Sequence, residues 1–67
     1  RHHVMLKIYD ILGNEVKELV NEYIPPGEHS ITWDATDHSG KNVASGVYIC
    51  KLSAGSTTQT MRIVLVR

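Results

Sequence analysis

The segment Val43–Leu52 (VASGVYICKL) constrains the fold more than any other part of the chain. A turn that ends at Gly46 leads directly into alternating apolar residues, which is the pattern of a half-buried β-strand. Because successive strand residues point to opposite faces, alternate positions are expected to share one surface. The predicted core face consists of Tyr48, Cys50 and Leu52. The predicted outer face consists of Val47, Ile49 and Lys51.

Tyr48 stands two residues after Gly46, and two interpretations of it are about equally good. In the first, its hydroxyl bonds back to the preceding turn and fixes a corner of the chain, as in immunoglobulin-like (Ig-like) sandwiches. In the second, it is simply an aromatic residue that suits a half-buried strand. Both interpretations place Tyr48 in a strand, and neither gives it a catalytic role.

Four other segments extend this β pattern. Alternation of apolar and polar residues predicts strands at Val4–Tyr9, Glu28–Asp34 and Thr57–Val66. In Glu15–Tyr23 the apolar residues follow the i, i+3, i+4, i+7 spacing of a helix, but this short segment lies between glycine-containing turns. We therefore favour a strand with a β-bulge over a short helix.

Two further residues are expected to contribute to the core, one in a turn and one in the predicted strand Glu28–Asp34. Leu12, in the first turn, is expected to fold back over one end of it. Trp33, the only tryptophan, is expected to be a core anchor. The loop that follows, Asp34–Gly46, is the longest and has room for a short strand at Lys41–Ala44.

The five predicted strands indicate an all-β fold, specifically an Ig-like antiparallel β-sandwich. Such sandwiches have about seven strands, so one or two N-terminal strands are expected to be missing. We interpret residues 1–67 as a single module and a fragment of a larger protein. A missing strand would leave a sheet edge open to another segment or to a second copy, which predicts a homo-oligomer.

The charge and the cysteine content restrict the classes of partner. Seven basic and seven acidic residues cancel in a chain of 67 residues. This balance argues against nucleic acid or an anionic membrane as a partner. No apolar run approaches the roughly 20 residues that span a bilayer, so no transmembrane segment is predicted. The single cysteine, Cys50, excludes an internal disulfide and is expected to be a small buried hydrophobe.

Polar side chains crowd together only in the long loop. Asp34 and Asp37 are weak candidates for binding Ca²⁺, because their spacing differs from that of an EF-hand loop. Capping of turns by these side chains is the favoured interpretation. The four histidines have no known zinc-ligand spacing, and no glycine-rich phosphate loop is present. We therefore predict no catalytic residue, no cofactor and no enzyme activity.

Three segments carry a resemblance to known modules. They are Leu6–Val16 (LKIYDILGNEV), Pro25–Gly55 and Met61–Arg67 (MRIVLVR). Together they resemble the type A C-terminal sorting domains of the bacterial type IX secretion system. The part Trp33–Tyr48 (WDATDHSGKNVASGVY) is also similar to the Ig-like domain of the flagellar hook-capping protein FlgD.

The resemblance implies a non-catalytic module at the end of a larger extracellular protein, recognised by the secretion machinery and secreted or displayed at the cell surface by way of the periplasm. The motif residues are Gly13, Gly46 and Tyr48, with Met61–Arg67 as the terminal strand. Arg62 and Arg67 match the basic residues common near the end of such signals.

Two alternatives remain open. The first is a structural Ig module of a flagellar hook cap or other scaffold. The second is a carbohydrate-binding accessory module, which needs exposed aromatics in a row. Only Tyr9 and Tyr23 are candidates for that role, so this alternative ranks last.

Overall fold

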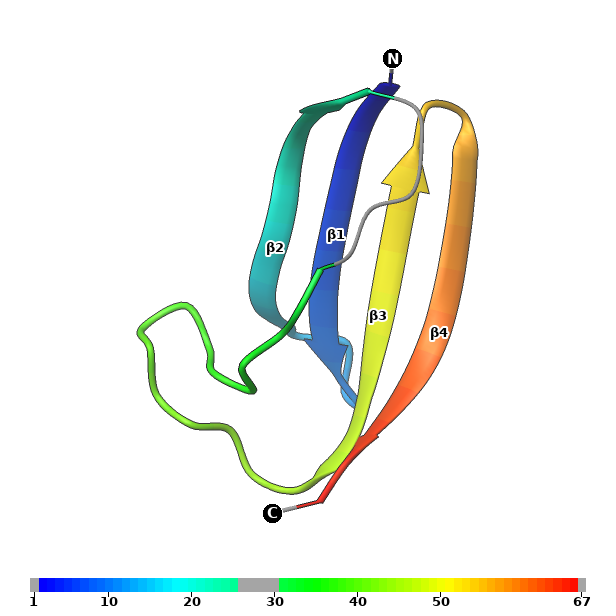
Figure 1. The fold of residues 1–67 in the computed structure, drawn as a ribbon. Coiled ribbons are helices and arrows are strands. Elements are labelled where there is room, and N and C mark those ends of the chain that lie inside the picture. Colours follow the sequence, from blue (N-terminus) through cyan, green and yellow to red (C-terminus); the bar gives the residue numbers. More distant parts are fainter. Residues whose placement is uncertain (1, 26–30, 67) are drawn as a thin grey trace.

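The computed structural model describes residues 2–25 and 31–66, which form one antiparallel sheet (Figure 1). Its strands are β1 (His2–Asp10), β2 (Glu15–Ile24), β3 (Gly46–Ala54) and β4 (Thr57–Leu65). They lie in the order β2-β1-β3-β4, so the first strand of the chain is inside the sheet. The chain forms two hairpins, β1–β2 and β3–β4, joined side by side where β1 pairs with β3.

The core lies on one face of the two central strands. Its buried residues are Leu6, Ile8, Tyr48 and Cys50, and Ile8 is only 1% exposed. The register explains this grouping, because Ile8 pairs directly with Cys50 and therefore shares its face. The predicted core positions Tyr48 and Cys50 of β3 are thus confirmed, and Leu52 is partly buried against the core.

The ambiguous segment is a strand with two irregularities. Leu6 pairs with Val20 but the next residue, Lys7, pairs with Glu18, so Leu19 is an extra residue in β2. A second register shift follows between Ile8 and Tyr9. Each bulge resets the alternation of side chains along the strand. This is why apolar residues at helical spacing reach the core from a strand: Val16, Leu19 and Val20 all pack against it.

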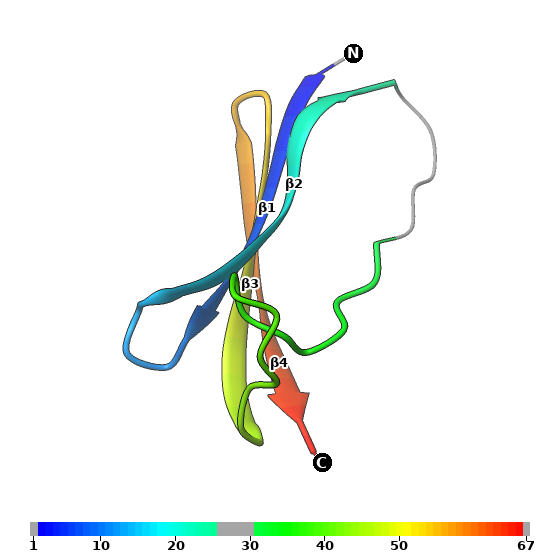
Figure 2. The same ribbon diagram turned by 90° about the vertical axis from the view of Figure 1, so that its left-hand side faces the viewer.

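Residues 31–45, which precede β3, lie on one side of the sheet (Figure 2). There Trp33 and Val43 pack against the core. The Trp33 ring meets the Tyr48 ring edge to face, with centroids 5.3 Å apart. Trp33 thus packs against the core with its side chain half-buried.

Three predictions of the fold need correction. The described residues contain four strands and not five, because Ile31–Asp34 is not a strand and residues 28–30 of that predicted strand lie outside the described part. A short strand at Lys41–Ala44 is reduced to one isolated bridge between Thr36 and Asn42. Leu12 does not cover the core, since it is 84% exposed. The described residues form a single sheet, so the predicted second layer of a sandwich is not confirmed.

The exposure of Leu12 follows from the structure of the first turn. The Asp10 carboxylate accepts hydrogen bonds from the backbone amides of Leu12 and Asn14, at 3.0 and 2.9 Å. Gly13 has a φ of 91°, a backbone conformation that suits glycine. The turn is therefore fixed by Asp10, and Leu12 is held away from the core.

Tyr48 makes the bond that the first interpretation predicted. Its hydroxyl donates to the carbonyl oxygen of Ala44 at 2.6 Å, four residues back along the chain. This contact joins the end of the long loop to the start of β3 and confirms the corner.

We expect Tyr48→Phe to lower the free energy of unfolding by about 1–3 kcal/mol, because the carbonyl of Ala44 loses its donor in a half-buried place. Urea unfolding followed by far-UV circular dichroism measures this change. Tyr9→Phe is the matched control, since Tyr9 lies outside the core cluster. Equal losses in the two variants would contradict a specific role for the corner.

Candidate functional site

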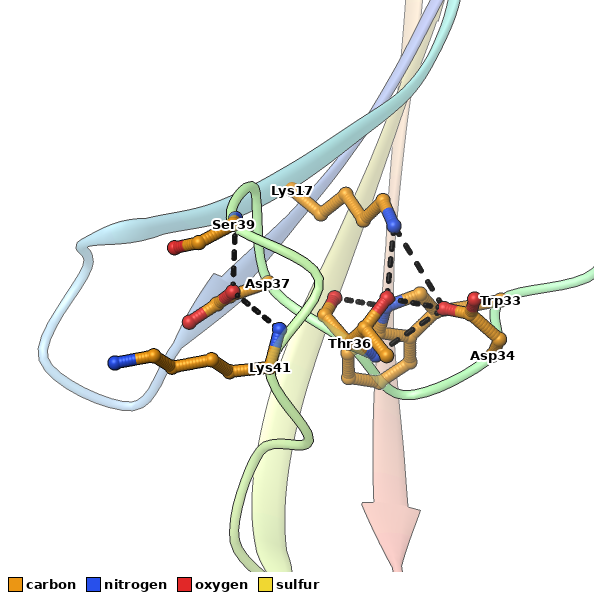
Figure 3. A network of polar contacts seen from close by, with 7 residues as sticks. All are labelled: Lys17, Trp33, Asp34, Thr36, Asp37, Ser39 and Lys41. Atoms are coloured by element: carbon orange, nitrogen blue, oxygen red, sulfur yellow. Dashed lines mark hydrogen bonds and ion pairs between the residues drawn. The ribbon is translucent and has the colours of Figure 1, made fainter.

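The long loop is organised by two aspartates, each closing its own turn (Figure 3). Asp34 Oδ1 accepts hydrogen bonds from the Thr36 hydroxyl at 2.5 Å and from the Thr36 backbone amide at 3.2 Å. The Lys17 ammonium, from β2, lies 2.8 Å from the Thr36 hydroxyl and 3.7 Å from the Asp34 carboxylate. The indole N–H of Trp33 donates to the Thr36 carbonyl at 3.0 Å. This network joins the loop to β2.

Asp37 closes the second turn. Its Oδ1 accepts the backbone amides of Ser39 at 2.9 Å and Lys41 at 3.0 Å (Figure 3). The two carboxylates thus bind neighbouring amides and hydroxyls, which is the capping role favoured for them. Among residues 2–25 and 31–66 no three His, Cys, Asp or Glu side chains are grouped as metal ligands.

These contacts lower the pKa of the carboxyl groups. The Thr36 hydroxyl lowers the pKa of Asp34, and the Lys41 amide lowers that of Asp37. The pKa of Asp10 is lowered chiefly by the Asn14 amide, and that of Glu15 by Lys7 and then His38. All four favour the ionised form in the folded state.

Acid should therefore destabilise the fold. A carboxyl group whose pKa is lower in the folded state stabilises it above the unfolded pKa, and this contribution is lost as the pH falls through the folded pKa. We expect the melting temperature to be level near neutral pH and to fall below about pH 4. Thermal unfolding at a series of pH values tests this. Asp37→Asn should flatten the acid limb, and an unchanged profile in that variant would contradict our assignment.

A polar cavity of about 480 Å³ lies beside the Tyr48 corner. Glu15 and His38 line it, and the His38 Nε2 lies 2.9 Å from the Glu15 carboxylate. Glu15 is also 3.2 Å from the Lys7 ammonium. The sequence pattern did not reveal this contact, because Glu15 and His38 lie in different segments. The carboxylates that line this cavity already bind backbone amides or cations. They therefore hold the turns together.

A second, apolar cavity of about 470 Å³ lies on the core face of the sheet. Its lining includes Trp33 and Ile31 from the loop together with Met61 and Ile63 from β4. Of the described residues, the segment 31–45 thus covers the core face only in part, toward β2. Cys50 also lines this cavity, and burial raises the pKa of its thiol, which disfavours the reactive thiolate.

The motif residues are spread over the molecule. Gly13 lies in the β1–β2 turn and Gly46 at the start of β3 beside Tyr48. Met61 and Arg62 lie in β4, at the edge of the sheet, and both are exposed. Arg67 lies outside the described residues. The structure brings Gly46 and Tyr48 together but places the β4 residues and Gly13 on separate elements.

The candidate aromatics for sugar binding do not form a row. Tyr9 and Tyr23 share the outer face, but Tyr9 pairs with Glu15 at one end of β2 and Tyr23 pairs with His3 near the other end. The Tyr23 ring instead meets the His3 ring edge to face, at 4.9 Å between centroids.

These features define a small Ig-like β module, in which a tyrosine corner and a capped loop hold one sheet. The sequence profile of the FlgD Ig-like domain matches residues 2–58, and the chain therefore belongs to the FlgD Ig-like domain family. Comparisons with curated proteins and with solved structures found no match. In the described part of the chain there is no helix long and apolar enough to cross a membrane.

Proposed function

We propose that this chain is a non-catalytic sorting module of a larger secreted bacterial protein, and that the type IX secretion machinery recognises it. The proposal rests on the resemblance of its motifs to type A sorting domains. The structural observation that supports it is the exposure of β4. This strand is at an edge of the sheet, with Met61 and Val64 63% and 65% exposed. An edge strand with exposed apolar side chains is a surface to which another protein can add.

A non-catalytic role agrees with the hydrogen bonds and ion pairs that the carboxylate side chains make. Asp34 and Asp37 hold the loop through their Oδ1 atoms, and Glu15 holds Lys7 and His38, so these carboxylates contribute to the structure of the loop and of the turns. We therefore assign the parent protein's activity to other domains and export to this module.

A secretion assay tests the proposal in a bacterium with an intact type IX system. A fluorescent reporter carries residues 1–67 at its C-terminus. We expect it at the cell surface or in the medium, and deletion of Met61–Arg67 should leave it in the periplasm. Because this deletion also removes part of β4, the double variant Met61→Thr, Val64→Thr keeps the strand and removes only its exposed apolar groups.

The matched control is the double variant Ile11→Ser, Leu12→Ser, which removes exposed apolar groups from the β1–β2 turn. We expect this control to be exported and the β4 double variant to be retained. Retention of the unmodified reporter, or equal export of both double variants, would overturn recognition through β4.

A structural role in a flagellar hook cap or other scaffold is the second candidate. Membership of the FlgD Ig-like domain family is the observation that favours it. In that case the reporter stays in the periplasm, and the module binds neighbouring domains of its parent protein.

A further inference from the structure

We propose that copies of this chain associate head to tail through their sheet edges, with β4 of one copy pairing with β2 of the next. This inference goes beyond sorting and does not depend on it. In it, each edge of the sheet binds another copy of the same chain.

The topology makes such a junction geometrically simple. All three strand pairs are antiparallel, so the two edge strands, β2 and β4, run in opposite directions. A copy translated along the sheet, without rotation, therefore places its β2 antiparallel to β4 of its neighbour. The contact is heterologous and leaves an open edge at each end, so association can continue beyond a dimer.

The β4 edge has the properties of a pairing template. It pairs with β3 from Thr57 to Leu65 without a register shift. In the described residues no strand lies on its other side. It carries one charge, on Arg62, and none of the prolines or bulges that usually protect an edge.

The charges identify the complementary edge. All seven acidic residues lie within residues 1–37, whereas residues 38–67 contain four basic residues and no acidic one. Three of the acidic residues are in β2: Glu15, Glu18 and Glu22. Pairing β4 with β4 would bring together the C-terminal halves of two copies, which contain no acidic residue. Pairing β4 with β2 instead places a basic edge beside an acidic edge.

One register satisfies the faces of both strands. Arg62 pairs with Ile49 and Glu18 pairs with Lys7, which places both charges on the outer face. With Arg62 opposite Glu18, the bulge at Leu19 puts Met61 opposite Val20, both on the core face. The pairing then runs along β2 from Glu18 towards Ile24. This pairing avoids the N-terminal part of β2, where the His38 amide already donates a hydrogen bond to the Val16 carbonyl at 3.1 Å.

This junction also extends the apolar surface. Met61 lines the cavity on the core face and is 63% exposed. Val20 of the next copy would lie beside it, so pairing removes apolar area from water as well as joining opposite charges.

Sedimentation velocity of the 67-residue chain, over a wide range of concentration, tests the proposal. At low salt we expect the average mass to rise with concentration past that of a dimer. At about 1 M salt, where the Debye length is about 3 Å, the association should weaken. A monomer at every concentration would overturn the proposal.

Charge exchange tests the register. Arg62→Glu and Glu18→Lys should each abolish association, because like charges then meet at every junction. An equal mixture of the two variants should associate again, since each junction regains one acidic and one basic residue. Lys51→Glu, on the central strand β3, is the control. It replaces a basic residue by an acidic one, which is the reverse of Glu18→Lys, and this variant should associate as the unmodified chain does.

Symmetric pairing of β4 with β4 gives a different pattern. Glu18→Lys would then have no effect, and the mass would stop at that of a dimer. Either result, with circular dichroism showing all variants folded, would refute the head-to-tail junction.

Discussion

Ile8→Ala is expected to bring this domain close to unfolding at room temperature. Ile8 is the most buried residue of the core, 1% exposed, and pairs with Cys50 at the centre of the sheet. Truncation of a buried isoleucine costs about 2–5 kcal/mol, since it removes buried methyl groups and leaves a cavity. A domain of this length has a total stability of about 3–10 kcal/mol. The loss is therefore a large fraction of the whole.

Thermal unfolding followed by circular dichroism measures this effect, and we expect the melting temperature to fall by on the order of 10–20 °C. The matched control is Ile11→Ala, which makes the same chemical change at a side chain that is 69% exposed. It should alter stability by no more than about 0.5 kcal/mol. Equal effects at the two positions would show that Ile8 is not the centre of the core.

Trp33→Ala is expected to cost about 3 kcal/mol, the lower end of the range for a truncated aromatic, because the ring is only half-buried. The change removes the contact with the Tyr48 ring and the hydrogen bond to the Thr36 carbonyl. Urea unfolding followed by far-UV circular dichroism measures the loss.

Trp33→Phe separates the two contributions. It keeps a ring against Tyr48 but loses the indole N–H, so it should cost about 1 kcal/mol. Limited proteolysis should cut the loop of the alanine variant faster than that of the phenylalanine variant. If both variants unfold at the same urea concentration as the unmodified chain, Trp33 does not anchor the loop.

Alternation was a reliable guide to the strands of the sheet. It located β1, β3 and β4 to within a few residues and assigned the core side of β3 correctly, as the burial of Tyr48 and Cys50 shows. It succeeded because one face of a central strand is covered by other side chains and the opposite face is less so. For Tyr48 the sequence left two equally good interpretations, and the hydrogen bond from its hydroxyl to the Ala44 carbonyl decides for the corner.

The loop could not be predicted in the same way. Residues 31–34 alternate as a strand does, but Asp34 bonds Thr36 and the Trp33 indole bonds the Thr36 carbonyl. Such local side-chain bonds compete with the hydrogen bonds of a sheet. The Glu15–His38 contact depends on the loop lying beside β2, and nothing in the local pattern encodes that arrangement.

The position of β1 between β2 and β3 has a consequence for how the chain folds. Each hairpin closes over a short turn, but the β1–β3 junction joins Leu6 to Leu52, near opposite ends of the chain. Forming that junction closes a long loop before its contacts are made, so we expect docking of the two hairpins to limit the folding rate. Closure entropy grows slowly with loop length, by about 0.6 kcal/mol for each doubling. Insertions between β2 and β3 should therefore slow folding only slightly. A substitution in the β1–β3 junction should slow folding strongly.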